Sequence, residues 1–366
     1  MTKVLLGDVV QINPSTKVNK GQSVKFISMD KLDPFTKVPN GYEKRKFSSG
    51  TKFTNGDTLL ARITPCLENG KTAFVDFLDD LEVAAGSTEF VILRNIEGLT
   101  DPAYIYYLSI SPAFRDYAIK SMVGTSGRQR VQNDVLAKME LSLPPLDQQK
   151  KVANILGSLD EKIELNRRMN ETLEQLGQAL FRHYFVDKTK RGNNIQTLPL
   201  GERIRPKRGK SLQSKNMIHG NIPVISGGLK PAGFHNKANA VAPVITVSAS
   251  GANAGFVSVW GEPVWSADSS YIDSTITQYV YTYYLFLKNK QKEIYDMQTG
   301  SGQPHIYPKH IELLEITDLS ECEFNDFEQR VRPLFDMIHK NKKQIDYLSN
   351  IRDSLLPKLI SGEIEI

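Results

Sequence analysis

The sequence of 366 residues predicts an α+β fold. We expect two mixed α/β globular domains in tandem repeat, separated by two long helices packed as an antiparallel coiled coil with pseudo-twofold symmetry. Three observations predict this fold: short motifs recur in one order in both halves, short β-like runs fill each half, and each half ends in a heptad pattern. The expected boundaries are 1–143 and 187–323 for the globular domains, and 144–186 and 324–366 for the helices.

The internal repeat is visible in several pairs of segments. Leu6-Gly7-Asp8-Val9 returns in outline as Leu200-Gly201-Glu202-Arg203, and each motif opens a globular domain. Three further pairs keep a single register, which chance similarity rarely does over such a length. They are Tyr104–Tyr107 with Tyr279–Thr282, Ser126–Val131 with Ser301–Ile306, and Leu141–Pro144 with Ile316–Leu319.

Runs rich in β-branched and aromatic residues, separated by Asn-Gly turns and other turn signals, predict strands in both domains. They are Lys25–Met29, Thr58–Ile63, Thr72–Phe77, Glu89–Leu93, Pro223–Ser226, Val244–Ser248, Gly255–Val259 and Tyr271–Asp273. Asp101-Pro102 is typical of a helix start, with the aspartate as cap and the proline at the first helical position. The tyrosines at 104, 106 and 107 could stack on bases, but their helical spacing favours packing.

Two long amphipathic helices follow the globular domains. The first starts after Pro144-Pro145, where Asp147 can cap its first turn, and Gly362 is expected to end the second. The predicted seams are Val152, Ile155, Leu159, Met169, Leu173, Leu176 and Leu180 in the first helix, and Val331, Leu334, Ile338, Ile345, Leu348, Leu355 and Leu359 in the second. Apolar residues beside the seams favour a further protein partner: Leu156, Ile163, Phe335 and Leu356.

Two asparagines interrupt these seams, Asn166 on an a position and Asn341 on a d position. A buried amide at such a position commonly fixes register and partner. The alternative is that each side chain reaches the edge of the seam, and the sequence leaves both interpretations open. In either case, two helices of one chain with matching apolar seams bury these seams most simply by packing on each other.

Composition and motifs exclude several classes of function. Lys and Arg exceed Asp and Glu by only 5 charges, which permits nucleic acid as a partner without proving it. The two cysteines, Cys66 and Cys322, suit a reducing cytoplasm, and the N-terminal segment lacks a signal-peptide core. No nucleotide-binding glycine motif or metal-ligand spacing occurs, so we expect no cofactor, no metal and no catalytic residue. The triplet Asp160-Glu161-Lys162 has a nuclease-like spacing but lies in the first long helix, where charges are expected on the outer face.

Polar and basic loops in equivalent parts of the two domains are candidate DNA-binding sites. The loop 124–130 combines glycines with Arg and Gln, the side chains suited to guanine and adenine edges, and 300–305 is its counterpart. Basic clusters could contact phosphates, and a small polar loop follows Ser248. Each loop alone is more often solvated surface. The candidates are Lys44, Arg45, Lys46, Arg62, Arg128, Gln129, Arg130, Lys207, Arg208, Lys210, Ser250, Asn253, Ser301, Gln303 and His305.

A family resemblance rests mainly on Leu143–Leu156, followed by Leu159–Ile163. With the opening Leu6–Val9, the Gly127–Val131 loop and the ending Leu355–Glu363, it resembles the specificity subunits of type I restriction-modification enzymes. The resemblance covers the chain in order, as target-recognition domain, conserved helix, second target-recognition domain and second conserved helix. The second copy departs from it, with Leu319-Ser320-Glu321-Cys322 in place of the paired prolines.

The resemblance implies a non-catalytic subunit that binds double-stranded DNA and docks two methyltransferase subunits along its helices, with motor-nuclease subunits joining through that complex. Each domain would then read one half of a bipartite, asymmetric target, with an unread gap set by the helices. Two other classes stay open. A stand-alone DNA-binding regulator would bind a bipartite site without partners, and a coiled-coil scaffold would show no salt-dependent DNA binding.

Overall fold

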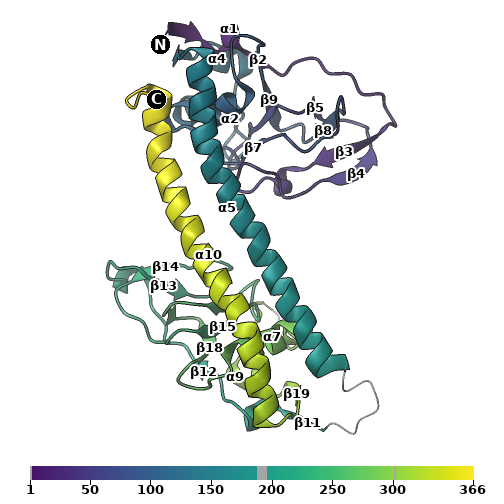
Figure 1. The fold of residues 1–366 in the computed structure, drawn as a ribbon, viewed down its shortest axis with the longest axis vertical. Helices are drawn as coiled ribbons and strands as arrows, with labels where there is room; N and C mark the ends of the chain where they lie inside the picture. Colours follow the sequence, from purple (N-terminus) through teal and green to yellow (C-terminus); the bar gives the residue numbers. More distant parts are fainter. Residues whose placement is uncertain (1, 188–195, 301) are drawn as a thin grey trace. The chain divides into compact units, whose positions relative to one another are not determined.

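The computed structural model describes residues 2–187, 196–300 and 302–366. The chain divides into two compact units, one of Met1–Leu165 with Gln344–Ile366 and one of Asn166–Lys343. Each unit contains a mixed α/β globular body and a part of both long helices, α5 (Leu146–Phe181) and α10 (Glu321–Ser361) (Figure 1). The α+β fold class predicted from the sequence is confirmed.

Two four-stranded sheets form the body of the first unit, in the orders β2-β9-β6-β7 and β4-β3-β8-β5, and β1 pairs with β10. Strands β6 and β9 are largely buried because most of their side chains are apolar on both faces. The bounds are β1 (Thr2–Leu5), α1 (Leu6–Val9), β2 (Val10–Ile12), β3 (Ser23–Ile27), η1 (Met29–Lys31), β4 (Glu43–Lys46), β5 (Thr51–Phe53), β6 (Thr58–Ala61), β7 (Thr72–Phe74), β8 (Ala84–Gly86), β9 (Phe90–Asn95), α2 (Pro102–Ile110), α3 (Pro112–Lys120), α4 (Asn133–Ala137) and β10 (Glu140–Leu143).

Helix α2 begins as the sequence predicts. The Asp101 side chain accepts a hydrogen bond of 2.9 Å from the backbone N–H of Tyr104, and Pro102 occupies the first turn. Tyr104, Tyr106 and Tyr107 are buried in the core of the first unit. The packing interpretation of these tyrosines is therefore confirmed, and buried rings of this kind are not available for base stacking.

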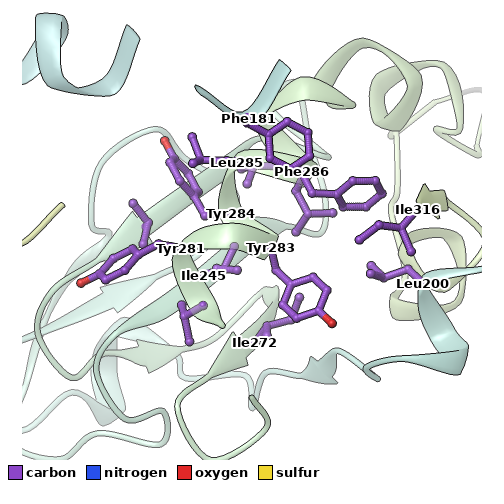
Figure 2. Packing of buried hydrophobic residues seen from close by; sticks show 14 of the residues in the cluster. Phe181, Leu200, Ile245, Ile272, Tyr281, Tyr283, Tyr284, Leu285, Phe286 and Ile316 are labelled. Atoms are coloured by element: carbon purple, nitrogen blue, oxygen red, sulfur yellow. The ribbon is translucent and has the colours of Figure 1, made fainter. Parts of the chain in front are cut away.

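The second unit repeats this plan with the sheets β12-β18-β15-β16 and β14-β13-β17 and the pair β11-β19. Its core gathers around α7, where Tyr283, Leu285 and Phe286 meet apolar side chains of the sheet and Phe181 of α5 (Figure 2). The bounds are β11 (Thr197–Pro199), η3 (Leu200–Glu202), β12 (Lys207–Arg208), η4 (Ser214–Asn216), β13 (Ile222–Ile225), β14 (Gly233–His235), β15 (Val244–Ser248), β16 (Val257–Trp260), β17 (Trp265–Ser266), β18 (Ser269–Asp273), α7 (Val280–Asn289), α8 (Gln291–Asp296), α9 (Pro308–Glu312) and β19 (Glu315–Thr317).

All the predicted strands overlap observed strands. The Val244–Ser248 prediction coincides with β15, whereas the Lys25–Met29 prediction is displaced by two residues from β3. The short pair β1-β10 was not predicted, because each strand has only four residues and only β10 alternates polar and apolar residues. It joins Thr2 to Leu143 and so ties the start of the chain to the residues before α5.

Within each unit, the segments of α5 and α10 pack antiparallel. In the first unit, Val152 and Leu156 share a core with Leu356 and Leu359. In the second unit, Asn341 donates a hydrogen bond of 2.9 Å from Nδ2 to Oδ1 of Asn170. Toward the end of α5, Phe181 contacts Phe327 with 6.0 Å between ring centroids. Residue numbers fall along α10 as they rise along α5, which is the antiparallel arrangement that the sequence predicts.

The buried stripe of α5 differs from the predicted seam. Ile155, Met169 and Leu176 are 37%, 38% and 46% exposed, whereas Leu156 and Ile163 are buried. The physical reason is that α5 packs on the globular body as well as on α10, so its contact face is turned by one position. The apolar residues beside the seams do not indicate a further partner, contrary to the prediction, because all four are buried within the chain: Leu156, Ile163, Phe335 and Leu356.

Both seam asparagines are buried, Asn166 to 1% exposure and Asn341 to 5%. The structure thus favours the buried-amide interpretation over side chains that reach the solvent edge.

Asp160 is also buried, contrary to the expectation of an outer-face charge. Its Oδ1 lies 2.7 Å from Nη1 of Arg352 on α10, and its Oδ2 accepts a hydrogen bond of 2.8 Å from the Tyr107 hydroxyl on α2. Both charged side chains are 5% exposed. This triad gives the acidic triplet a structural explanation, because the carboxylate joins both long helices to the body of the first unit.

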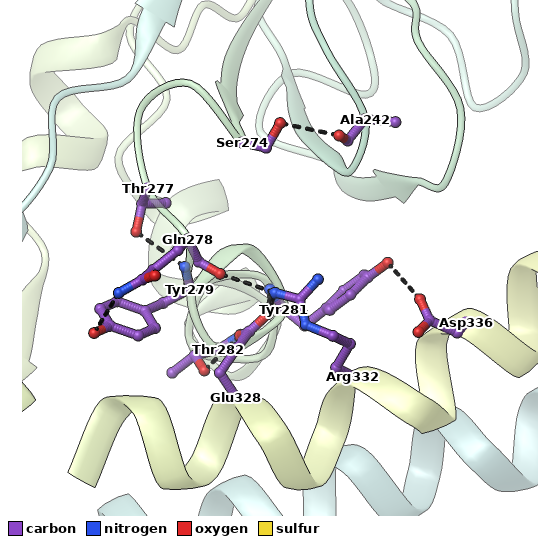
Figure 3. Close-up of polar contacts among 10 residues, drawn as sticks. All are labelled: Ala242, Ser274, Thr277, Gln278, Tyr279, Tyr281, Thr282, Glu328, Arg332 and Asp336. Carbon is purple, nitrogen blue, oxygen red and sulfur yellow. Dashed lines mark hydrogen bonds and ion pairs between the residues drawn. The ribbon is translucent and has the colours of Figure 1, made fainter. Parts of the chain in front are cut away.

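A polar residue near the start of each long helix holds the N-terminus of a tyrosine-rich helix. In the first unit, buried Gln149 accepts a hydrogen bond of 2.9 Å from the N–H of Asp101. In the second, Glu328 accepts hydrogen bonds from the backbone N–H and hydroxyl of Thr282, at 2.9 and 2.8 Å, and pairs with Arg332 (Figure 3). Burial raises the pKa of Glu328, opposed by these hydrogen bonds.

Among the helices that the structure describes, none is long and apolar enough to cross a membrane.

Candidate nucleic-acid interface

Each unit contains an equivalent corner, where a hairpin lies against the ends of two interior strands of one sheet, β6 and β9 in the first unit and β15 and β18 in the second. In the first unit, the N–H of Arg62 donates to the carbonyl of Glu89, and the N–H of Val131 donates to the carbonyl of Arg62, both at 2.9 Å. In the second unit, Ala249 donates to Asp268 at 3.1 Å and Ile306 donates to Ala249 at 2.9 Å. The two corners therefore share one hydrogen-bonding scheme.

The hairpins close in the same way. Val123 pairs with Arg130 in the first unit, and Thr299 pairs with His305 in the second. The residue after each closing pair, Val131 or Ile306, enters the core. This correspondence confirms the register in which the sequence aligned Val131 with Ile306.

Glycine permits the tight path of the first hairpin. Gly124 and Gly127 have φ angles of 140° and 76°, which side chains rarely allow. A Cβ atom on Gly124 would lie 2.9 Å from the carbonyl oxygen of Arg128. The hairpin backbone therefore depends on glycine, and it leaves Arg128 exposed and Gln129 partly exposed beside the closing pair.

The arginines of the first corner have different partners. Arg130 binds Glu89 through two nitrogens, with Nη2 at 2.7 Å from Oε1 and Nε at 3.0 Å from Oε2. The hydrogen bond from Arg130 lowers the pKa of Glu89, while partial burial opposes it. Arg62 turns inward and donates from Nη2 to the carbonyl of Val131 at 3.2 Å. Arg128 is exposed, and its side chain makes no ion pair within the described parts of the chain.

The basic cluster of the first unit lies on another sheet. Lys44, Arg45 and Lys46 form most of β4, an exposed edge strand that pairs with β3. The Arg45 guanidinium lies over the Phe26 ring, 3.1 Å from its centroid. Arg62 and Glu89 belong to the rim of the other sheet, so the two predicted contact groups of this unit are separate clusters.

In the second unit, the structure brings together three residues that the sequence predicts separately. Nη2 of Arg208 lies 2.7 Å from Oδ1 of Asp268, and the Ser250 hydroxyl donates to Oδ2 of the same carboxylate. Ser250 also forms a β-bridge with His305, whose ring stacks on Tyr307 with 5.9 Å between centroids. Strand β12, the loop after β15 and the second hairpin thus meet at Asp268.

The remaining candidates in the second unit surround this corner less closely. Lys207, Lys210 and Gln303 are exposed, whereas Asn253 is partly buried. The carbonyl of Lys210 accepts a hydrogen bond of 2.8 Å from the Trp265 indole. Ser301 lies outside the described residues.

Sequence reasoning missed Glu89 and Asp268, although a signal was present. Each is the third residue of a Ser-x-acidic triplet, Ser87-Thr88-Glu89 or Ser266-Ala267-Asp268, directly before an equivalent strand. Such a triplet is short and acidic, whereas DNA contacts are typically made by cationic side chains.

The chemistry of the corners suits recognition. Cationic, amide and hydroxyl groups stand on loops that a sheet holds in place, where they can donate and accept hydrogen bonds to base edges and phosphates. Among the described residues, no group of three or more His, Cys, Asp or Glu side chains is arranged to hold a metal ion.

Comparison with known proteins agrees with these features. Residues 1–175 match the family model described as "Type I restriction modification DNA specificity domain". The HindI specificity subunit of Haemophilus influenzae is 35% identical over 133 residues, which are 36% of this chain and 28% of that subunit. The MjaIX specificity subunit of Methanocaldococcus jannaschii is 24% identical over 301 residues, which are 72% of this chain and 69% of that subunit.

The fold is similar to that of a solved structure described as a type I restriction-modification S subunit from M. genitalium. The TM-score is 0.62 at 19% sequence identity, and the superposition covers 98% of this chain and 96% of that one. The match to the Haemophilus influenzae subunit spans little more than a quarter of that relative, whereas the structural match extends over nearly the whole chain.

Proposed function

Since this chain belongs to the family of type I restriction-modification specificity subunits, we propose that it is the DNA-recognition subunit of such a complex. Each globular body reads one half of a bipartite, asymmetric target in double-stranded DNA. The subunit has no catalysis of its own. It selects the site at which methyltransferase subunits act, and motor-nuclease subunits join through the same complex.

One observation supports this proposal above the others: the two corners share a backbone scheme but carry different side chains. Arg62, Arg128 and Gln129 stand in the first corner, whereas Arg208, Ser250 and His305 stand in the second. A common scaffold with different donors and acceptors is what a reader of two unlike half-sites requires. The match of residues 1–175 to a DNA specificity domain supports DNA as the ligand.

The long helices supply the spacer and the docking surface of the proposal. Both α5 and α10 contribute residues to both units, so their length sets the length of chain between the two readers. Ile155 and Leu165 of α5 are exposed in the first unit, and Met169 and Leu176 in the second. We place a methyltransferase subunit against each of these apolar stretches, because exposed large apolar side chains at helical spacing suit a partner helix.

The experiment that tests the proposal uses one variant in each corner. The full chain is co-expressed with its methyltransferase subunit, and methylated adenines are mapped in host DNA. We expect Arg128→Ala to relax recognition at the first half-site only, and the matched variant Gln303→Ala to relax the second only. Each lost bidentate contact should reduce discrimination at its base pair by about tenfold.

Two results would contradict the proposal. Equal loss at both half-sites from either variant would assign these residues to folding or subunit docking. Salt-dependent binding to a bipartite site by the chain alone, with no effect on methylation, would instead support a stand-alone regulator.

A further inference from the structure

The acidic residues at the two corners are unexpected on a DNA-reading surface. Glu89 and Asp268 each lie one residue before an equivalent strand, β9 or β18, and their carbonyls take part in the equivalent hydrogen bonds. A carboxylate near DNA repels the phosphates, so its presence at the same place in both copies calls for a physical reason. In both copies the carboxylate binds an arginine that the sequence predicts as a DNA contact.

The arginines reach the equivalent carboxylates from different segments. Arg130 belongs to the closing pair of the first hairpin, whereas Arg208 belongs to strand β12. An ion pair between an arginine and the equivalent carboxylate therefore occurs in both units, although the two arginines are not at equivalent positions in the repeat. A simple remnant of duplication would have kept the arginine at one equivalent position, so the pairing itself has a role.

The geometry leaves the guanidinium groups able to bind a second partner. Glu89 occupies the Nε and Nη2 side of Arg130, at 3.0 and 2.7 Å, and Nη1 donates to the Arg128 carbonyl at 3.5 Å, which leaves one hydrogen on Nη1 and one on Nη2. Asp268 takes only Nη2 of Arg208, and its other oxygen accepts from Ser250. Arg130 and Arg208 are still 42% and 40% exposed. Each arginine is thus fixed on one side and open on the other.

We propose that Glu89 and Asp268 are positioning residues that hold Arg130 and Arg208 in the orientation for guanine, one in each half-site. Guanine offers O6 and N7 to two N–H groups of a single guanidinium. An unrestrained arginine loses much rotamer freedom when it binds, and a carboxylate that fixes it beforehand lowers this entropic cost. The inference rests on the proposed function, and it adds that each half-site contains a guanine read by an arginine supported by a carboxylate.

The test measures base preference with the intact complex of the full chain and its methyltransferase subunit. Randomised duplex DNA is selected with wild type, Glu89→Gln and Asp268→Asn. We expect Glu89→Gln to reduce preference for guanine by about tenfold at one position of the first half-site, and Asp268→Asn to do the same in the second. The matched control is Glu82→Gln, which removes a carboxylate of the first unit that binds Lys25 away from the corner. The control should leave the selected sequence unchanged.

A second variant separates positioning from folding. Arg130→Lys keeps the positive charge, but a lysine cannot bind guanine and Glu89 side by side. This variant should therefore lose the preference for guanine at the same position as Glu89→Gln. The double variant, Glu89→Gln with Arg130→Lys, should lose no more guanine preference than Arg130→Lys alone, because both changes disrupt the same ion pair.

The outcomes distinguish the inference from the proposed function. Suppose that the wild-type complex selects a bipartite site. If Glu89→Gln then keeps full guanine preference, or weakens binding to all sequences equally, the inference is wrong and the proposed function stands. If Arg130→Lys leaves every base preference intact, the inference is equally wrong. If wild type selects no bipartite site, the proposed function itself fails.

Discussion

At the scale of single residues, ion pairs between arginine and carboxylate side chains distinguish the two corners from ordinary solvated loops. The loop 124–130 could be predicted as a contact from its glycines, Arg and Gln. The different partners of the arginines in and beside this loop could not be predicted, because they depend on which side chains the fold brings near. Arg62 turns to a backbone carbonyl, Arg130 binds Glu89, and Arg128 extends into solvent. Such choices arise from contacts between residues far apart in the chain, which sequence spacing does not encode.

The Glu89–Arg130 pair predicts a pH dependence of stability. The hydrogen bond from Arg130 keeps the pKa of Glu89 below its ordinary value of 4.5. A carboxyl group with a lowered pKa in the folded state stabilises the fold above its unfolded pKa, and this contribution is lost as the pH falls through the folded value. We expect wild type to exceed Glu89→Gln in stability at neutral pH, with the difference shrinking below about pH 4.5. Urea unfolding of both proteins between pH 7 and pH 3 measures it, and a difference that grows on acidification would contradict the pairing.

At the scale of elements, the buried triad shows how tertiary contacts override a helical pattern. The heptad pattern predicts the existence, direction and end of both long helices, and Gly362 with a φ of 75° follows α10 as expected. It could not predict that α5 also packs on the globular body. That second contact buries Leu156 and Asp160 and leaves Ile155 exposed.

The Asp160–Arg352 pair predicts a large loss of stability when one partner is removed. Arg352→Met leaves the Asp160 carboxylate buried without its counter-charge, which should lower the free energy of unfolding by about 3 to 5 kcal/mol. Arg352→Met with Asp160→Asn should recover most of the loss, because the amide oxygen still accepts from Tyr107. Chemical denaturation of the three proteins measures both effects.

The matched control is Lys120→Met, which breaks the exposed Lys120–Asp116 pair in the same unit. It should change stability little, because both side chains of that pair are solvated. A triad variant as stable as this control would show that the buried pair does not hold the helices to the body.

At the scale of the whole molecule, the repeat is the basis of the proposal that one chain reads an asymmetric site. Two bodies of equivalent fold present different side chains, and the same two helices contribute to both. The repeat and its register could be predicted from a few motifs. The target sequence could not, because in the proposed function the choice of base depends on side-chain orientation at the corners.

The most direct test of this account maps methylated adenines for wild type and for a chain shortened by one heptad in both helices. Residues 162–168 of α5 and 344–350 of α10 suit the deletion, because the contacts Asp160–Arg352 and Asn170–Asn341 flank both ranges. We predict that methyltransferase subunits bound to the wild-type chain methylate a bipartite, asymmetric site. The deletion shortens each helix by about 10 Å. The complex with the shortened chain should therefore recognise the same two half-sites, with the unread gap between them narrower by about three base pairs. Methylation at altered half-sites with an unchanged gap would contradict the account.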